Sequence, residues 1–152
     1  MFACSFDPGW FRPSFDQDKY EPHTIHEFDF SVLNISRGQG PRRTADEGIM
    51  VSGSCDDIGR IQIKVESKSG TDPCDSGFYI SSGSKTVPTG LIPRHPIQPM
   101  KWKDHCVISL SWIDGATSLQ EPIEFYLQFE SVNHFLAKGD HSQKLQVSHK
   151  GN

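Results

Sequence analysis

The chain has 152 residues, with 15 Lys and Arg against 19 Asp and Glu, which gives a formal net charge of −4. This length fits one domain, the acidic balance argues against a general nucleic-acid-binding protein, and the longest aliphatic run, Ile49–Val51, is too short to cross a bilayer. Ile, Val, Leu and Phe together make up 36 residues, enough apolar surface for a packed core.

The composition favours strands over helices. The chain has 12 Ile, 7 Val and 10 Phe but only 4 Ala and 7 Leu. β-branched and aromatic side chains suit a pleated sheet, whereas Ala and Leu suit a helix. The 13 Gly and 10 Pro fall between short apolar segments, as they do where turns join short strands. We therefore predict an all-β fold, an antiparallel β-sandwich of seven or eight strands with long Gly- and Pro-rich loops.

The N-terminal segment differs from the rest of the chain. Residues 1–23 carry six aromatic residues and three prolines without periodicity, which predicts an irregular arm whose aromatic residues dock on the domain. Residues 24–152 form a single predicted sandwich domain. Its expected strands are apolar or alternate between apolar and polar residues, and they lie at 28–32, 49–51, 61–65, 78–80, 107–113, 122–130 and 143–148.

Three local signals bear on how these strands connect. The step from Val32 to Leu33 breaks the alternation, which predicts a bulge or a change of sheet. The turn sequence Asp114–Gly115 predicts that 107–113 and 122–130 form a long-looped hairpin. Residues 81–99 hold four prolines and two glycines and predict an extended loop, with short edge pairing at Leu91 and Ile92.

The four cysteines bear on the compartment. An even number spread over loops and strand ends suits disulfides formed in an oxidising compartment. Cys55 and Cys74 each lie in a turn-like segment and flank the strand 61–65, so we predict that they pair, with Cys106 able to replace either one. This predicts an extracytoplasmic protein, periplasmic or secreted. A cytoplasmic protein with four free thiols is the alternative, because no charged-then-apolar signal segment precedes the domain.

The first residues, Met1-Phe2-Ala3-Cys4, resemble the end of a bacterial lipoprotein signal, in which a small residue precedes the lipidated cysteine. The resemblance implies a lipid anchor on Cys4. Such an anchor would be the protein's one attachment to a membrane, and it would leave three thiols and a single bridge.

Motifs for catalysis and metal binding are absent. The sequence has no Gly-x-Ser-x-Gly elbow, no Cys-x-x-Cys or His-Glu-x-x-His spacing and no calcium loop. Residues 77–86 fail the phosphate-loop pattern because Ser84 separates Gly83 from Lys85. His23 and His26 would point to opposite faces of a strand. We therefore predict no catalytic residue, no metal and no cofactor.

Three features indicate binding instead. Trp102 lies between two lysines, where an exposed ring could anchor a protein or stack on a sugar. The loop 37–43 holds three of the six arginines and could present guanidinium groups to an acidic partner. Prolines stiffen the loop 81–99, which lowers the entropy lost on binding. We place the predicted partner-binding residues on the loops 37–43 and 81–103, and they are Arg42, Arg43, Lys85, Arg94 and Trp102.

The function predicted by elimination is that of a non-catalytic, extracytoplasmic protein-binding domain. Its most concrete form is a bacterial immunity protein, which neutralises a toxin, or a secretion-associated protein. The expected partner is another protein, such as a secreted toxin or enzyme, and not a nucleic acid. A carbohydrate-binding module that uses exposed tryptophan is the first alternative, and a small hydrolase is the second.

Overall fold

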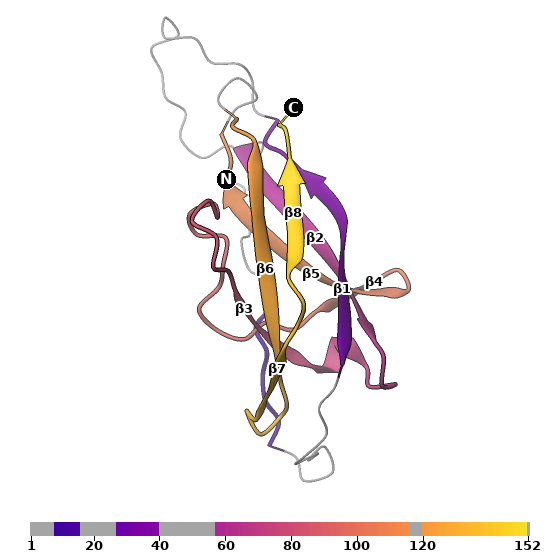
Figure 1. Cartoon of the computed structure of the whole chain (residues 1–152). Helices are drawn as coiled ribbons and strands as arrows, with labels where there is room; N and C mark the ends of the chain where they lie inside the picture. The colour runs from indigo at the N-terminus through magenta and orange to yellow at the C-terminus, as the bar shows by residue number, and fades with distance from the viewer. Residues whose placement is uncertain (1–7, 16–26, 40–56, 116–119, 152) are drawn as a thin grey trace, which may run out of the picture.

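A computed structural model describes residues 8–15, 27–39, 57–115 and 120–151 (Figure 1). These ranges contain eight strands, no α-helix and one short 3₁₀ turn, η4 (Pro73–Asp75). No helix within them has the length and apolar content that crossing a membrane requires. The predicted all-β class and strand number are confirmed. The boundary between arm and domain stays a prediction, because most of residues 1–23 lie outside the described ranges.

The first sheet has four antiparallel strands. In spatial order they are β1 (Phe28–Ser36), β2 (Ile58–Ser67), β5 (His105–Ile113) and β4 (Met100–Trp102). The predicted break in β1 is a bulge: Val32 pairs with Ile63 and Asn34 with Gln62, so Leu33 is the extra residue.

The second sheet is built around one long strand. Its members are β3 (Gly77–Ser81), β6 (Ile123–Val132), β7 (Lys138–His141) and β8 (Leu145–His149). β3 pairs with one edge of β6, whereas β7 and β8 share the other edge. β8 lies beside β1, so the two sheets approach each other along that side of the sandwich (Figure 1).

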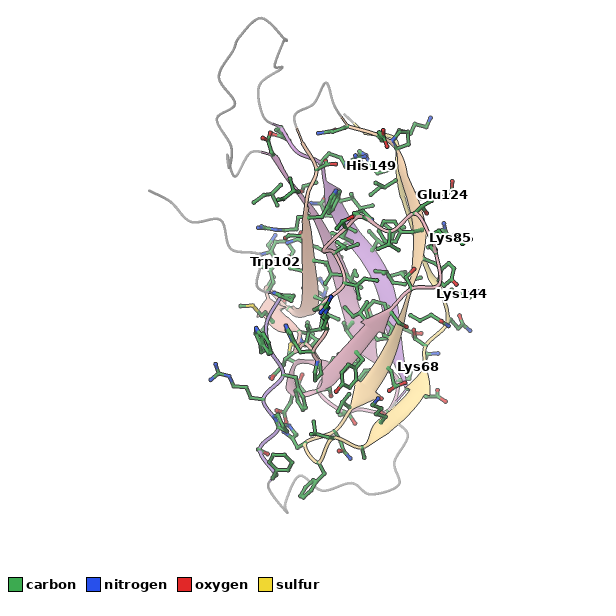
Figure 2. The ribbon with its side chains drawn as sticks, turned by 90° about the vertical axis from the view of Figure 1, so that its left-hand side faces the viewer. Lys68, Lys85, Trp102, Glu124, Lys144 and His149 are labelled. Carbon is green, nitrogen blue, oxygen red and sulfur yellow. A yellow bond between two sulfur atoms is a disulfide. The ribbon has the colours of Figure 1, made fainter. Side chains whose placement is uncertain are left out.

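The core lies between the sheets, where alternate residues of both point inward (Figure 2). The largest fully buried side chains are Phe78, Phe125, Phe129, Ile61, Ile63, Ile97, Ile108, Leu110, Leu127 and Val147. Phe30 of β1 stacks on Phe129 of β6, with ring centroids 3.9 Å apart, and so joins one sheet to the other. Burying one such side chain contributes roughly 1.5–3 kcal/mol, which fixes the inward face of each strand.

The predicted hairpin between 107–113 and 122–130 is wrong. β5 pairs with β2 and β4 in the first sheet, whereas β6 belongs to the second sheet. Asp114 and Gly115 do mark a change of direction, but the chain there crosses between sheets. A hairpin and a crossing between sheets both need a turn, so the turn sequence alone cannot distinguish these two connections.

Pairing within the loop 81–99 also differs from the prediction. Leu91 is buried and Ile92 half-buried, and neither lies in a strand. The pairing occurs at Ile97, which bridges Phe78 of β3 on one side and Trp10 of the N-terminal arm on the other. The loop therefore forms a short β-bridged segment between the arm and the second sheet.

Hydroxyl groups complete the edge of β6 beyond the end of β3. Ser82 donates a hydrogen bond to the carbonyl of Tyr126, and the Tyr126 N–H donates to the Ser84 hydroxyl over 3.1 Å. Thr86 donates to the carbonyl of Glu124 over 2.6 Å. Side chains here satisfy backbone groups that would otherwise need another strand.

The predicted pairing of Cys55 with Cys74 is wrong, because Cys74 is bonded to Cys106. The pairing of β2 with β5 places Cys106 opposite Val65, near the end of β2. The chain then turns back through η4, which brings Cys74 to the same place, with the two Cα atoms 5.4 Å apart. Distance along the sequence favoured Cys55, but strand pairing decides the contact. Cys55 and the proposed lipid site Cys4 lie outside the described residues.

Candidate binding surface

Residues 8–15 of the arm lie along the segment 96–98. Phe11 N–H donates to the carbonyl of Pro96 over 3.0 Å, and Gln98 N–H donates to the carbonyl of Gly9 over 3.0 Å. Phe11 is buried against Gly77, where a Cβ atom would lie 2.4 Å from Cγ of the ring. The absence of a side chain at Gly77 therefore makes room for the arm.

Trp10 is held at the surface by this docking. Its side chain is 57% exposed, and its ring stacks on His95 with centroids 3.2 Å apart and planes 8° apart. The stack covers part of the indole and orients the remainder outward. Trp10 is thus an exposed aromatic side chain with a fixed position.

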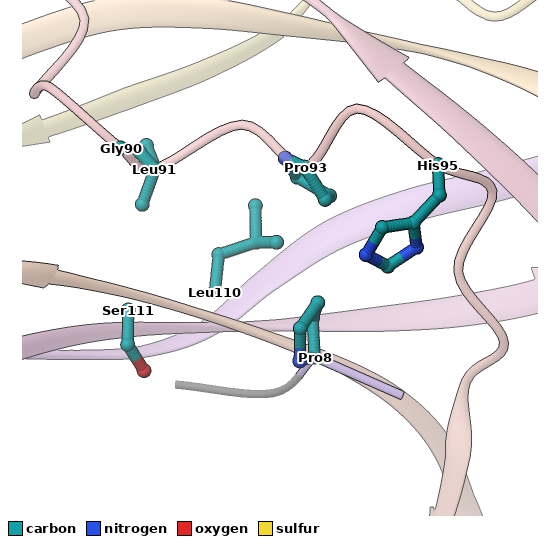
Figure 3. A pocket seen from close by; sticks show the side chains of 7 residues that line it. All are labelled: Pro8, Gly90, Leu91, Pro93, His95, Leu110 and Ser111. Atoms are coloured by element: carbon teal, nitrogen blue, oxygen red, sulfur yellow. The ribbon is translucent and has the colours of Figure 1, made fainter. Parts of the chain in front are cut away.

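A small cavity lies next to this stack (Figure 3). Its volume is about 180 Å³, and its walls include Pro8, Leu91, Pro93, His95 and Leu110. Sites for small organic ligands typically measure roughly 300–1,000 Å³. The cavity is therefore closer in size to a single side chain than to a cofactor.

The β4–β5 hairpin carries two further exposed side chains. Met100 and Trp102 lie on the same face of β4 and are 66% and 47% exposed. The connecting loop has two residues, Lys103 and Asp104, since Trp102 pairs with His105. Lys103 has a φ of +54°, in the left-handed region that favours glycine, and its Nζ lies 4.5 Å from the centroid of the Trp102 ring.

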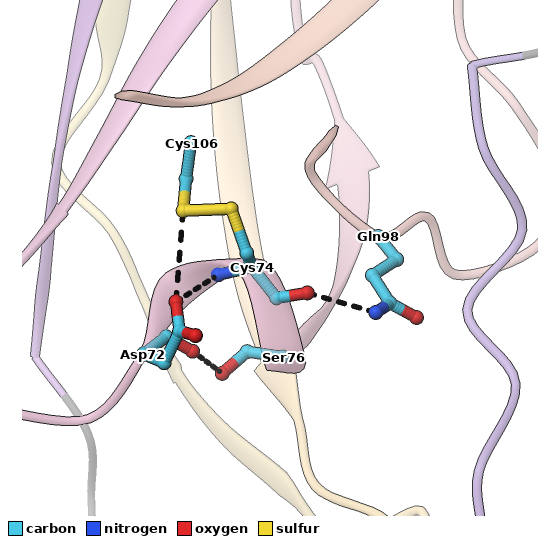
Figure 4. The surroundings of a disulfide bond; sticks show 5 residues. All are labelled: Asp72, Cys74, Ser76, Gln98 and Cys106. Carbon is cyan, nitrogen blue, oxygen red and sulfur yellow. Dashed lines mark hydrogen bonds between the residues drawn. A yellow bond between two sulfur atoms is a disulfide. The ribbon is translucent and has the colours of Figure 1, made fainter. Parts of the chain in front are cut away.

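A covalent bond anchors this hairpin at the residue pair next to the one that flanks its turn (Figure 4). Cys106 lies opposite Lys101 in the β4–β5 ladder and is bonded to Cys74 of η4. The turn is held in place as well: Asp72 Oδ1 accepts a hydrogen bond from Cys74 N–H over 2.9 Å, and Gln98 Nε2 donates to the Cys74 carbonyl over 2.8 Å. Trp102 therefore projects from a well-supported strand.

The exposed aromatic residues of arm and hairpin lie on adjoining segments. Gly9, next to Trp10, is close to Met100, because a Cβ atom built on this glycine would lie 3.8 Å from Met100 Cγ. We call the exposed side chains of Trp10, Met100 and Trp102 on these adjoining segments, together with His95 on which Trp10 stacks, the tryptophan surface.

The predicted partner-binding residues do not form one cluster. Arg94 is exposed and precedes His95, and Trp102 belongs to the tryptophan surface. Lys85 is also exposed, but it lies on the opposite side of the molecule from Trp102 (Figure 2). Arg42 and Arg43 lie outside the described residues.

Arg37 forms a buried ion pair and does not add to a surface cluster. Its side chain donates from Nε and Nη2 to the two carboxylate oxygens of Asp114, each over 2.8 Å, and the residue is 3% exposed. Nη2 also donates to the carbonyl of Glu121 over 2.6 Å. The predicted guanidinium cluster is therefore wrong at this position, because the sequence gives no sign that Asp114 lies beside Arg37.

Asp114 is held in its charged form. Burial disfavours the carboxylate, but hydrogen bonds from Arg37 and from the Gly38 N–H outweigh this cost and lower the pKa of Asp114 below its ordinary value. The Gly38 bond measures 2.7 Å. The group ties the end of β1 to the end of β5, which is a structural role.

Sequence reasoning missed three members of the tryptophan surface. Met100 and Trp102 alternate around Lys101, which is the pattern of one strand face, but three residues are too few for a clear periodic signal. Trp10 and His95 meet through the docking of the arm, and the sequence predicts that its aromatic residues dock but not where they dock.

Metal-binding potential is low in the described ranges. One group of three close ligand side chains occurs there, Asp72, Cys74 and Cys106. The disulfide uses both sulfur atoms, so one carboxylate remains, which is too few ligands for a structural metal site.

No known protein family, no curated protein and no solved structure matches the chain. A proposed function must therefore rest on the chemistry of its own surface residues.

Proposed function

We propose that the protein is a non-catalytic binding domain that recognises another protein through the tryptophan surface. One observation carries the proposal: Trp10, Met100 and Trp102 are exposed on adjoining segments of the described structure. Tryptophan is among the residues that contribute most to binding energy, because it buries a large area in a defined orientation. Methionine adapts its shape to a partner at low cost.

The contacts that hold these side chains in place favour binding as well. A side chain that is already ordered loses little conformational entropy when a partner covers it. Trp10 is ordered by its stack on His95, and Trp102 stands on a hairpin fastened by the disulfide. The adjacent cavity offers a site for one side chain of the partner.

A carbohydrate is the second candidate ligand. Exposed indole rings such as those of Trp10 and Trp102 stack on sugar rings. A protein partner is preferred because Met100 provides apolar surface that a sugar would not use.

We further propose an extracytoplasmic location, since the Cys74–Cys106 disulfide is compatible with an oxidising compartment. A toxin-neutralising or secretion-associated role is the specific form of the proposal that agrees with such a location. In that case the partner would be a secreted toxin or enzyme.

The experiment is affinity isolation from an extract of the native source with the immobilised full chain. Trp102→Ala should fail to retain the partner, whereas the matched variant Lys85→Ala, on the opposite side, should retain it. A glycan array run in parallel distinguishes the second candidate. Sugar binding that is lost in Trp102→Ala would replace a protein by a carbohydrate as the ligand.

A further inference from the structure

We propose that His134 is a proton-sensitive latch that holds Ser14 of the N-terminal arm on the sandwich. His134 lies in the turn between β6 and β7 and is 8% exposed. Its Nδ1 accepts a hydrogen bond from Ser14 N–H over 3.0 Å, and its carbonyl accepts one from Phe15 N–H over 3.3 Å. The latch itself does not depend on the proposed function. Only an effect of the latch on partner binding would rest on it.

The contacts of the ring define its protonation state. A ring nitrogen that accepts a hydrogen bond from an N–H group carries no proton. The proton of the neutral ring must therefore be on Nε2, which lies 3.1 Å from the Asp75 carbonyl and 3.3 Å from Asp75 Oδ1. Both are acceptors, so the docked arm fits a neutral His134 with the proton on Nε2.

Protonation of His134 conflicts with the docked arm. A charged imidazole carries an N–H on both nitrogens, and Nδ1–H would then face Ser14 N–H, so that two donors meet. The Nε2–H bond to Asp75 would persist, since both forms of the ring have it. The hydrogen bond from Ser14 is therefore the contact that must break.

The charged surroundings of the ring are simple in the described structure. From η4, the Asp75 carboxylate faces Nε2. From the arm, the contacts are the Ser14 amide and the Phe11 ring, whose centroid lies 5.1 Å away, and neither is charged. Protonation therefore sets the ring against Ser14 and not against Asp75.

A second histidine touches the arm but would not act in this way. His95 stacks on Trp10, and its Nδ1 lies 3.2 Å from the carbonyl of Pro96, which accepts a bond from the neutral or the charged ring. A charged His95 would also be attracted to the indole ring. Among the described residues, His134 is therefore the histidine whose protonation breaks an arm contact, whereas the backbone bonds of Gly9 and Phe11 to the segment 96–98 should persist.

The test is amide hydrogen exchange of the arm in the full chain without a partner. Between about pH 7.5 and about pH 5, where histidine changes charge, Ser14 should lose about fivefold in protection after correction for intrinsic exchange, as expected for one lost hydrogen bond. His134→Asn offers an uncharged acceptor and should abolish this dependence. The matched variant His95→Phe keeps a stacked ring and should preserve it.

Two results would overturn the latch: protection of Ser14 that does not change with pH, or a pH dependence that survives in His134→Asn. The first of these results needs only the natural chain, so it does not depend on the folding of the variant. Because no partner takes part, a failure of the proposed function would leave this result untouched.

Discussion

The ring of Phe11 occupies the space that a side chain at position 77 would need. A Cβ atom on Gly77 would lie 2.4 Å from Phe11 Cγ, well inside van der Waals contact. This contact joins the arm to the first residue of β3 and positions Trp10 beside the hairpin that carries Trp102.

The first prediction is that Gly77→Ala loosens the arm. The added methyl group forces the buried Phe11 ring to move, and overpacking of this kind lowers the free energy of unfolding by about 1–3 kcal/mol. Chemical denaturation measures the loss. In a Phe11→Ala background the same substitution should cost much less, because the two sites interact directly. Equal costs in both backgrounds would show that Phe11 does not pack on Gly77.

The second prediction concerns the disulfide. Replacing Cys74 and Cys106 together by serine should lower the free energy of unfolding by about 3–4 kcal/mol in the chain-entropy model, given a sequence separation of 32 residues. Non-reducing peptide mapping should recover the two cysteines in one linked pair of peptides. Recovery of Cys74 linked to Cys55 would contradict the structure.

The third prediction concerns the ion pair of Arg37 with Asp114. Arg37→Ala leaves the buried carboxylate without its main donor, so the free energy of unfolding should fall by about 3–5 kcal/mol. Arg37→Lys should recover only part of this, since lysine cannot bind both carboxylate oxygens at once.

The same pair predicts an acid dependence of stability. Because the pKa of Asp114 is lowered in the folded protein, its contribution is fully present above the unfolded value of about 3.9 and is lost as the pH falls toward the folded value. Stability should decline below about pH 4. The decline should be shallower in Asp114→Asn than in the natural chain, and equal slopes would show that Asp114 does not contribute.

The strands were predictable from sequence where one face is buried. Ile61, Ile63 and Val65 alternate with polar residues because their side chains fill the core, and 123–129 behave in the same way. Alternation is a local property, however, and does not say which strand pairs with which. The error over the partners of β5 and β6 and the error over Cys74 have this common origin, since both needed knowledge of sheet pairing.

The candidate surface was predictable only in part. Exposure of Trp102 followed from the lysines on either side of it, and the structure agrees. The stack of Trp10 on His95 joins an arm without periodicity to a proline-rich loop, so no local sequence pattern predicts this contact. The burial of Arg37 depends on its ion pair with Asp114, which lies in the connection that follows β5. Contacts between distant segments decided each of these cases.

The measurement that tests the central claim most directly is the affinity of the purified partner for two matched variants, determined by calorimetry. Trp102→Ala should weaken binding about thirtyfold or more, which corresponds to about 2 kcal/mol, without lowering the melting temperature. Lys85→Ala, on the opposite side of the molecule, should stay within about threefold of the natural chain. A Trp102→Ala variant that binds within about threefold, or a Lys85→Ala variant that does not bind, would contradict the assignment of the tryptophan surface.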